Sequence, residues 1–118
     1  MFLAASVLLA GDVSGKWAGT IERTTEGSDT PDRVDQHYIE LKQEGVSIRG
    51  TAGPKQAQWK IENGKIDADH IVFEVAPPGA PFTLVYDLTV ADGELRGTLQ
   101  SKGGERKMSW KLGLKKGD

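Results

Sequence analysis

Two histidines are the side chains of this sequence best suited to acid–base or metal chemistry. His70 follows Asp67 and Asp69, and such a cluster has the donor atoms of a divalent-cation site. Surface turns also carry these residue types for local hydrogen bonding, which needs no metal. His37 falls in step with apolar neighbours, so its imidazole is expected to point into the fold, either toward a ligand or held by an internal hydrogen bond. We therefore predict no metal site at His70 and keep His37 as a candidate ligand-binding residue.

The aspartates of the first long polar stretch and the serines form no catalytic pattern. Asp29, Asp32 and Asp35 are spaced three apart, but the run lacks the glycine and distal glutamate of a calcium loop. The acidic residues fall mainly on positions that alternate with apolar ones, where they would be solvated. No serine lies in a nucleophile elbow, and no glycine-rich phosphate loop precedes a helical pattern. The sequence therefore predicts a protein that is not an enzyme and needs no cofactor.

Bulk composition narrows the class further. The chain has 118 residues, a size that suits one domain, and a net charge of -2 with no basic stripe, so we expect no nucleic-acid partner. There are no cysteines, so disulfides and thiolate metal sites are excluded and stability must come from a packed core. The 15 glycines and three tryptophans indicate many turns around a few large anchors, which is typical of β architecture.

Alternation of apolar and polar residues recurs along nearly the whole chain after residue 12, which indicates strands rather than helices. Asn63–Gly64 is the strongest hairpin signal, and further turns are expected at Gln43–Gly45 and Ala91–Gly93. The prediction is an all-β fold, a small antiparallel up-and-down β-barrel of about eight strands, because a meander buries its edges best by closing. The expected strands cover residues 13–22, 37–42, 46–52, 57–62, 82–90, 94–100 and 108–114, with 65–67 and 71–75 as either two short strands or one bent strand.

Two strand segments resemble each other and place a glycine at the same point. Ile48–Thr51 and Leu95–Thr98 have the same apolar-Arg-Gly-Thr order, each just after a turn that contains glycine. By alternation Gly50 and Gly97 point inward, and a glycine inside a strand often marks a sharp bend or a tapering barrel wall. Both are therefore predicted to be structural.

The first predicted strand carries a motif that resembles a known group of barrels. Gly15, Lys16 and Trp17, followed by Gly19, are similar to the Gly-x-Trp signature that opens the first strand of calycins, whether lipocalin-like or streptavidin-like. The polar stretch Thr24–Asp35 matches the long first loop of lipocalins. The chain lacks their Thr-Asp-Tyr motif and C-terminal helix, and it more closely resembles short exported bacterial barrel domains of unknown function. The resemblance implies that Trp17 packs at the closed end of the barrel and that Gly15 is structural.

The N-terminal residues 1–11 differ in composition from residues 12–118, which we predict to form the single barrel domain. Met1–Ala10 is almost wholly apolar and ends in small residues, as the h-region of a secretory signal does, although no basic residue precedes it. It predicts a signal-peptide remnant and a periplasmic or secreted protein; a short plug of the domain is the alternative. So short a segment forms no stable membrane span, which needs about 20 residues. A docked terminus would also permit a weak homodimer rather than a monomer.

The predicted barrel interior is the best candidate for function. A small apolar ligand could lie among the aromatic side chains that alternation places on the inward face of the strands. His37 and Tyr86 would then orient a polar end of the ligand. Alternatively, a barrel of about eight short strands fills its interior with side chains and leaves no cavity. The candidate ligand-binding residues are Trp59, Tyr86, His37, Phe73 and Phe82, and Trp110 is assigned to the structural set with Gly15, Trp17, Gly50 and Gly97.

A second function fits a filled barrel. The segment Ala76–Pro81 contains three prolines, and prolines pre-order a protruding loop and lower the entropy lost when it binds. The protein would then be an interaction or inhibitor module that contacts a protein partner through its end loops. The same composition would also suit a rigid connector.

Overall fold

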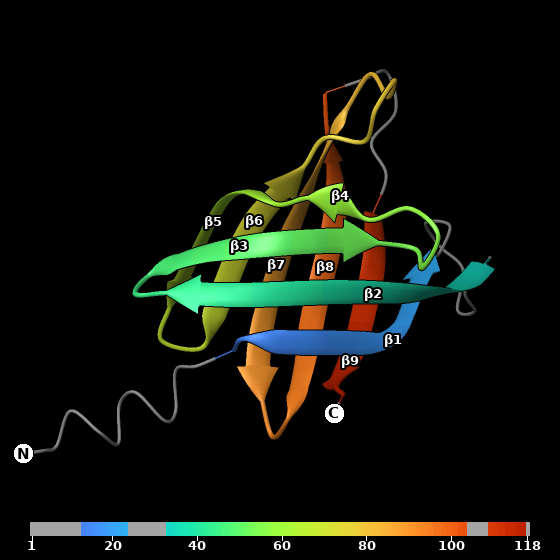
Figure 1. Cartoon of the computed structure of the whole chain (residues 1–118). Coiled ribbons are helices and arrows are strands. Elements are labelled where there is room, and N and C mark those ends of the chain that lie inside the picture. The colour runs from blue at the N-terminus through green and yellow to red at the C-terminus, as the bar shows by residue number, and fades with distance from the viewer. Residues whose placement is uncertain (1–12, 24–32, 104–108, 118) are drawn as a thin grey trace, which may run out of the picture.

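The computed structural model describes residues 13–23, 33–103 and 109–117, and every regular element within these ranges is a β-strand (Figure 1). None of the described residues forms a helix long and apolar enough to cross a membrane. The strands are β1 (Gly15–Arg23), β2 (Arg33–Glu44), β3 (Ser47–Gly53), β4 (Trp59–Lys60), β5 (Glu62–Asp67), β6 (His70–Val75), β7 (Thr83–Ala91), β8 (Glu94–Lys102) and β9 (Ser109–Lys116).

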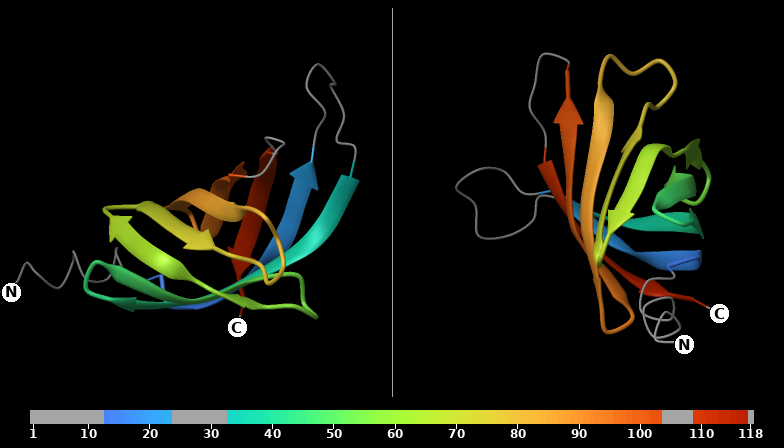
Figure 2. Two further views of the ribbon diagram at one scale, coloured as in Figure 1. Left: turned by 90° about the horizontal axis from the view of Figure 1, so that it is seen from above. Right: turned by 90° about the vertical axis from the view of Figure 1, so that its left-hand side faces the viewer.

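The strands form one closed antiparallel barrel. Except for β4 and β5, strands that follow each other in the chain pair with each other, and β1 pairs with both β2 and β9, so the first and last strands join. The short β4 and the longer β5 pair with successive parts of β3 and share one position around the barrel. The nine strands therefore occupy eight positions around the barrel. The views in Figure 2 show the sheet curling round on itself. The predicted all-β up-and-down barrel is confirmed.

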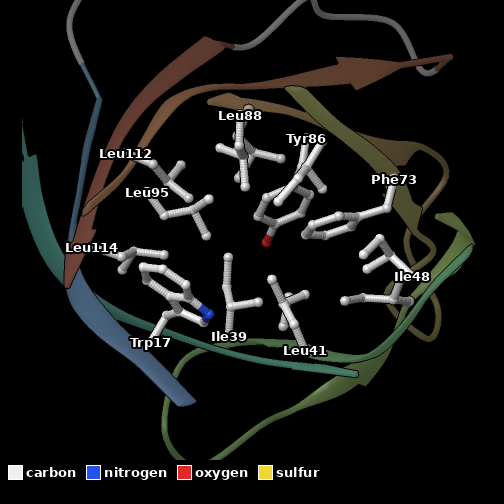
Figure 3. Packing of buried hydrophobic residues seen from close by; sticks show 14 of the residues in the cluster. Trp17, Ile39, Leu41, Ile48, Phe73, Tyr86, Leu88, Leu95, Leu112 and Leu114 are labelled. Atoms are coloured by element: carbon white, nitrogen blue, oxygen red, sulfur yellow. The ribbon is translucent and has the colours of Figure 1, made fainter. Parts of the chain in front are cut away.

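Alternation along the strands decides which side chains fill the interior. On β2, Ile39 and Leu41 are buried while Glu40 and Lys42 are exposed, and the same order recurs on the other long strands. Leucine, isoleucine and aromatic side chains from all around the barrel meet at its centre (Figure 3). Most of the interior is therefore filled by side chains, as one of the two sequence alternatives predicted.

One end of the barrel is closed around Trp17. The Trp17 side chain is buried, and its Nε1 donates a hydrogen bond to the Val13 carbonyl oxygen at 3.0 Å. The Val13 amide in turn donates to Gln43 Oε1 at 2.9 Å, which ties the start of the described chain to the end of β2. The Lys116 ammonium lies 5.9 Å from the centre of the Trp17 ring. The tryptophan of the Gly-x-Trp motif thus lies at a sealed end, and Met1–Ala10 lies outside the described residues.

Two predicted turns are wrong. Asn63–Gly64 lies inside β5, where the register with β6 shifts by one residue, and the hairpin turns instead at Ala68–Asp69. Asn63 takes a φ of 54°, which a bulge accommodates as readily as a turn. The extra residue of the bulge shifts the alternation of inward and outward side chains by one position. Ile61 before the bulge and Ile66 after it are therefore both buried. Between β2 and β3 the turn is Gly45–Val46 rather than Gln43–Gly45, and Val46 is 69% exposed.

Gly97 allows two strands to approach each other closely. A Cβ at this position would lie 2.0 Å from the Asp87 carbonyl oxygen and 2.8 Å from the Leu88 Cα on β7, both of which are backbone atoms. Gly113, on the outer face of β9, has nothing within 4 Å of the corresponding position. The inward glycine is therefore required by packing, and the outward one is not.

Replacing these two glycines by alanine tests that difference. We expect Gly97→Ala to lower the free energy of unfolding by about 2 kcal/mol, because the backbone of β7 must move. Gly113→Ala should change it by less than about 0.5 kcal/mol, as exposed substitutions usually do. Urea denaturation of the two variants measures both values, and equal losses would contradict the proposed close packing.

Candidate functional site

A pocket of about 450 Å³ opens at the end of the barrel opposite Trp17. Strands β2, β4, β7 and β9 begin at this end and β1, β3, β6 and β8 finish there, because the chain runs up and down. The pocket has an apolar floor, two tryptophans and a polar rim. Its lining residues are Ile21, Asp35, Gln36, His37, Tyr38, Pro54, Lys55, Gln56, Trp59, Leu84, Leu99 and Trp110.

The two tryptophans come from opposite walls of the barrel. Trp59 lies on β4 and Trp110 begins the inward face of β9, and these strands are four positions apart among the eight. Both side chains are half-buried and pack against the edge of the core. Three buried side chains, Ile21, Leu84 and Leu99, lie among the lining residues below them. An aromatic or aliphatic group entering the pocket would therefore meet apolar surface on several sides.

His37 and Tyr86 form a buried polar pair at the boundary between the pocket and the core. His37 Nε2 and the Tyr86 hydroxyl oxygen are 2.7 Å apart, and the rings stack with centroids 5.7 Å apart. Phe73 stacks on the other side of Tyr86 at 4.5 Å. Figure 3 shows the Tyr86 hydroxyl pointing from β7 into the interior. His37 is 5% exposed and lines the pocket, whereas Tyr86 is fully buried beneath it.

Burial keeps both members of this pair neutral. It lowers the pKa of His37 from 6.5 to about 4, because the imidazolium would lose its hydration. The same desolvation raises the pKa of Tyr86 above its ordinary value. At neutral pH the pair is thus an uncharged hydrogen-bonded unit, and the pocket floor carries a neutral imidazole.

The structure brings only part of the predicted ligand-binding set to the pocket. Trp59 and His37 line it, but Phe73 and Tyr86 belong to the filled core below, and Phe82 is half-buried outside the lining. Trp110, which the sequence assigned to the structural set, lines the pocket. Alternation placed the candidate aromatics and Trp110 on the inward face, but it does not give the height of the barrel at which each of them lies.

The other sequence candidates form no site within the described part of the chain. His70 contacts Asp87 across β6 and β7, rather than gathering Asp67 and Asp69 around an ion. No group of three or more potential metal-binding side chains occurs among residues 13–23, 33–103 and 109–117. Asp35 lines the pocket rim, while Asp29 and Asp32 lie outside the described residues.

Comparisons of this chain with models of known protein families, with curated proteins and with solved structures find no match. The closed barrel is consistent with the calycin-like resemblance of the first strand.

The buried His37 makes a testable contribution to stability as a function of pH. Because its pKa is about 4 in the folded protein and near 6.5 in the unfolded chain, the unfolded state binds the extra proton between these values. The free energy of unfolding should therefore fall by up to about 3 kcal/mol as the pH drops from 6.5 to 4. Urea denaturation across this range, compared with His37→Gln, isolates the effect because the carboxylates titrate in both proteins. Equal pH dependence in both proteins would contradict it.

Proposed function

We propose that this protein binds a small, largely apolar or aromatic molecule in the pocket at the open end of its barrel. The observation that carries the proposal is an opening of about 450 Å³ between Trp59 and Trp110, above an apolar floor. Ligand pockets of folded proteins have volumes of roughly 300–1,000 Å³ and combine apolar walls with a few polar groups. Because the rest of the interior is filled, the ligand would occupy only the upper part of the barrel.

The polar groups of the pocket suit recognition better than catalysis. A histidine with a pKa of about 4 is a weak proton acceptor at neutral pH, and a general base works best with a pKa near the working pH. His37 instead offers a fixed neutral group to a polar end of the ligand. Asp35 and Lys55 supply one charge of each sign at the rim. As part of the same proposal, the Gly-x-Trp resemblance and residues 1–11 favour an exported, calycin-type binding protein.

The proline loop favours a second function less strongly. The Ala80 amide donates a hydrogen bond to the Pro77 carbonyl oxygen at 3.1 Å, and Gly79 has a φ of 78°, so a tight turn pre-orders the segment. A protein partner could contact this turn. However, the six residues Ala76–Pro81 are all alanine, proline or glycine. Interface anchors are typically large aromatic side chains or arginine. The pocket therefore carries the proposal.

Two aromatic residues at the open end allow a matched test of ligand binding. A neutral naphthylamine dye should bind the native protein saturably, seen as dye fluorescence rising and tryptophan emission falling. Trp59→Leu should weaken this binding about tenfold, because the indole supplies one wall of the pocket. Phe82→Leu should leave the affinity unchanged, since Phe82 lies outside the lining residues. Absence of saturable binding by the native protein, or equal affinities for all three, would overturn the proposal.

A further inference from the structure

One wall of the pocket includes backbone groups as well as side chains, because β2 extends beyond the end of its partner strand β3. Strand β3 pairs with the second half of β2, and the last pair is Tyr38 with Gly53. Before Tyr38, the described residues give β2 a partner strand on one side only, which is β1. Figure 1 shows β2 continuing past the arrowhead of β3. The barrel is therefore closed along most of its height and leaves a short free strand edge at the open end.

The register fixes which backbone groups point to this free edge. The Glu40 carbonyl oxygen points toward β3, since it lies 1.8 Å from where a Cβ of Gly50 would be, and the Tyr38 carbonyl accepts a hydrogen bond from Gln58 Nε2 at 3.2 Å. Backbone groups of alternate residues point to the same side of a strand. The N–H and C=O of Gln36 must then point the same way as those of Tyr38 and Glu40, away from β1.

No strand within the described part of the chain pairs with Gln36 on this side. The next antiparallel pair after Tyr38 and Gly53 would join Gln36 to Lys55, but there the chain has already turned. The Ala57 amide donates to the Pro54 carbonyl oxygen at 3.0 Å and closes that turn. Residues 35–38 and 54–56 all line the pocket, so the free donor and acceptor of Gln36 lie at its wall.

Resting on the proposed function, we propose that the natural ligand is a short extended peptide, or a compound with a peptide-like amide. Its amide N–H and C=O pair with the backbone of Gln36 and add a short strand segment to the edge of β2. Residues directly opposite each other in an antiparallel pair point to the same face. In the β2–β3 register the place opposite His37 belongs to Pro54, so the inward side chain comes from the ligand residue opposite Asp35 and enters the pocket. That side chain is apolar or aromatic.

A peptide-like ligand matches both the backbone groups of Gln36 and the apolar floor of the pocket, whereas a pure hydrocarbon matches only the floor. A hydrocarbon would cover the Gln36 N–H and C=O without bonding them, and desolvating a polar group without giving it a partner weakens binding. A peptide amide supplies one donor and one acceptor in the geometry that the strand edge needs. The apolar floor then contributes to affinity through the single inward side chain.

The test uses the full chain and a blocked tripeptide, N-acetyl-Ala-Phe-Ala-amide, titrated by tryptophan fluorescence. The control ligand is the same peptide with every amide nitrogen methylated, which keeps the phenyl group and removes the donors. The protein variants are Gln36→Pro, which removes the edge N–H, and Gln36→Ala, which keeps it; both lose the hydrogen bond that the Tyr38 hydroxyl donates to Gln36 Oε1. Proline is tolerated at strand edges whose N–H is unused. Circular dichroism checks that both variants fold.

We expect the methylated peptide to bind the native protein at least fivefold more weakly than the parent, and the parent to bind Gln36→Pro more weakly by a similar factor. Gln36→Ala keeps the edge N–H and loses the same side chain, so the parent peptide should bind Gln36→Pro at least fivefold more weakly than it binds Gln36→Ala. Amide hydrogen exchange of Gln36, followed by NMR, should slow at least tenfold when the parent peptide is added. Exchange needs no variant, so it decides the matter even if Gln36→Pro does not fold.

Equal affinity for the two peptides together with unchanged exchange at Gln36 would overturn the peptide assignment. If the naphthylamine dye still binds and Trp59→Leu still weakens it, the proposed small-molecule function survives that result. If neither peptide nor dye binds, the proposed function itself fails.

Discussion

The pairing of β1 with β9 turns a linear meander into a barrel, and the other features of the molecule depend on it. Residues Trp17–Arg23 pair in register with Trp110–Lys116, so the two ends of the described chain are held side by side. This pairing removes two long strand edges that would otherwise expose unpaired N–H and C=O groups. It also forces all inward side chains into one enclosed volume. The sealed lower end, the filled centre and the open upper end are consequences of that closure.

Side-chain size and strand length then divide the enclosed volume. In the lower and middle parts, Leu88 and Phe73 face Ile39 and Leu41 from the opposite side, and these buried side chains fill the interior (Figure 3). Near the upper end the strands finish at different heights, and fewer side chains reach the axis. The His37–Tyr86 pair lies at the boundary between these regions. At that height His37 hydrogen-bonds to Tyr86 below it and still faces the pocket above it. Its imidazole is therefore buried and hydrogen-bonded at the same time.

The same difference in strand length leaves backbone groups of β2 unpaired at the open end, within the described part of the chain. The turn that follows β3 begins at Pro54, before the chain could pair with the start of β2, and β4 consists of only two residues. A longer β3 would have covered Gln36 and closed the wall of the pocket. Within the described residues, the barrel thus combines paired strands with a short unpaired edge at Gln36, and that edge lies in the same pocket as the two tryptophans.

Alternation indicated most of the strands and their inward faces, because a strand with one buried face must repeat every two residues. The short turns between them indicated the up-and-down order. Alternation placed Ile39, Phe73 and Leu99 inside correctly without any knowledge of their neighbours. It did not determine the turn at Ala68–Asp69, since Asn63 can take a positive φ in a bulge as well as in a hairpin, and only the pairing of β5 with β3 and β6 decides between them. Nor could it separate Trp59 and Trp110 at the pocket from Tyr86 in the core. All three have inward parity, and their height along the barrel axis depends on register and on where each strand ends, which are properties of the closed sheet.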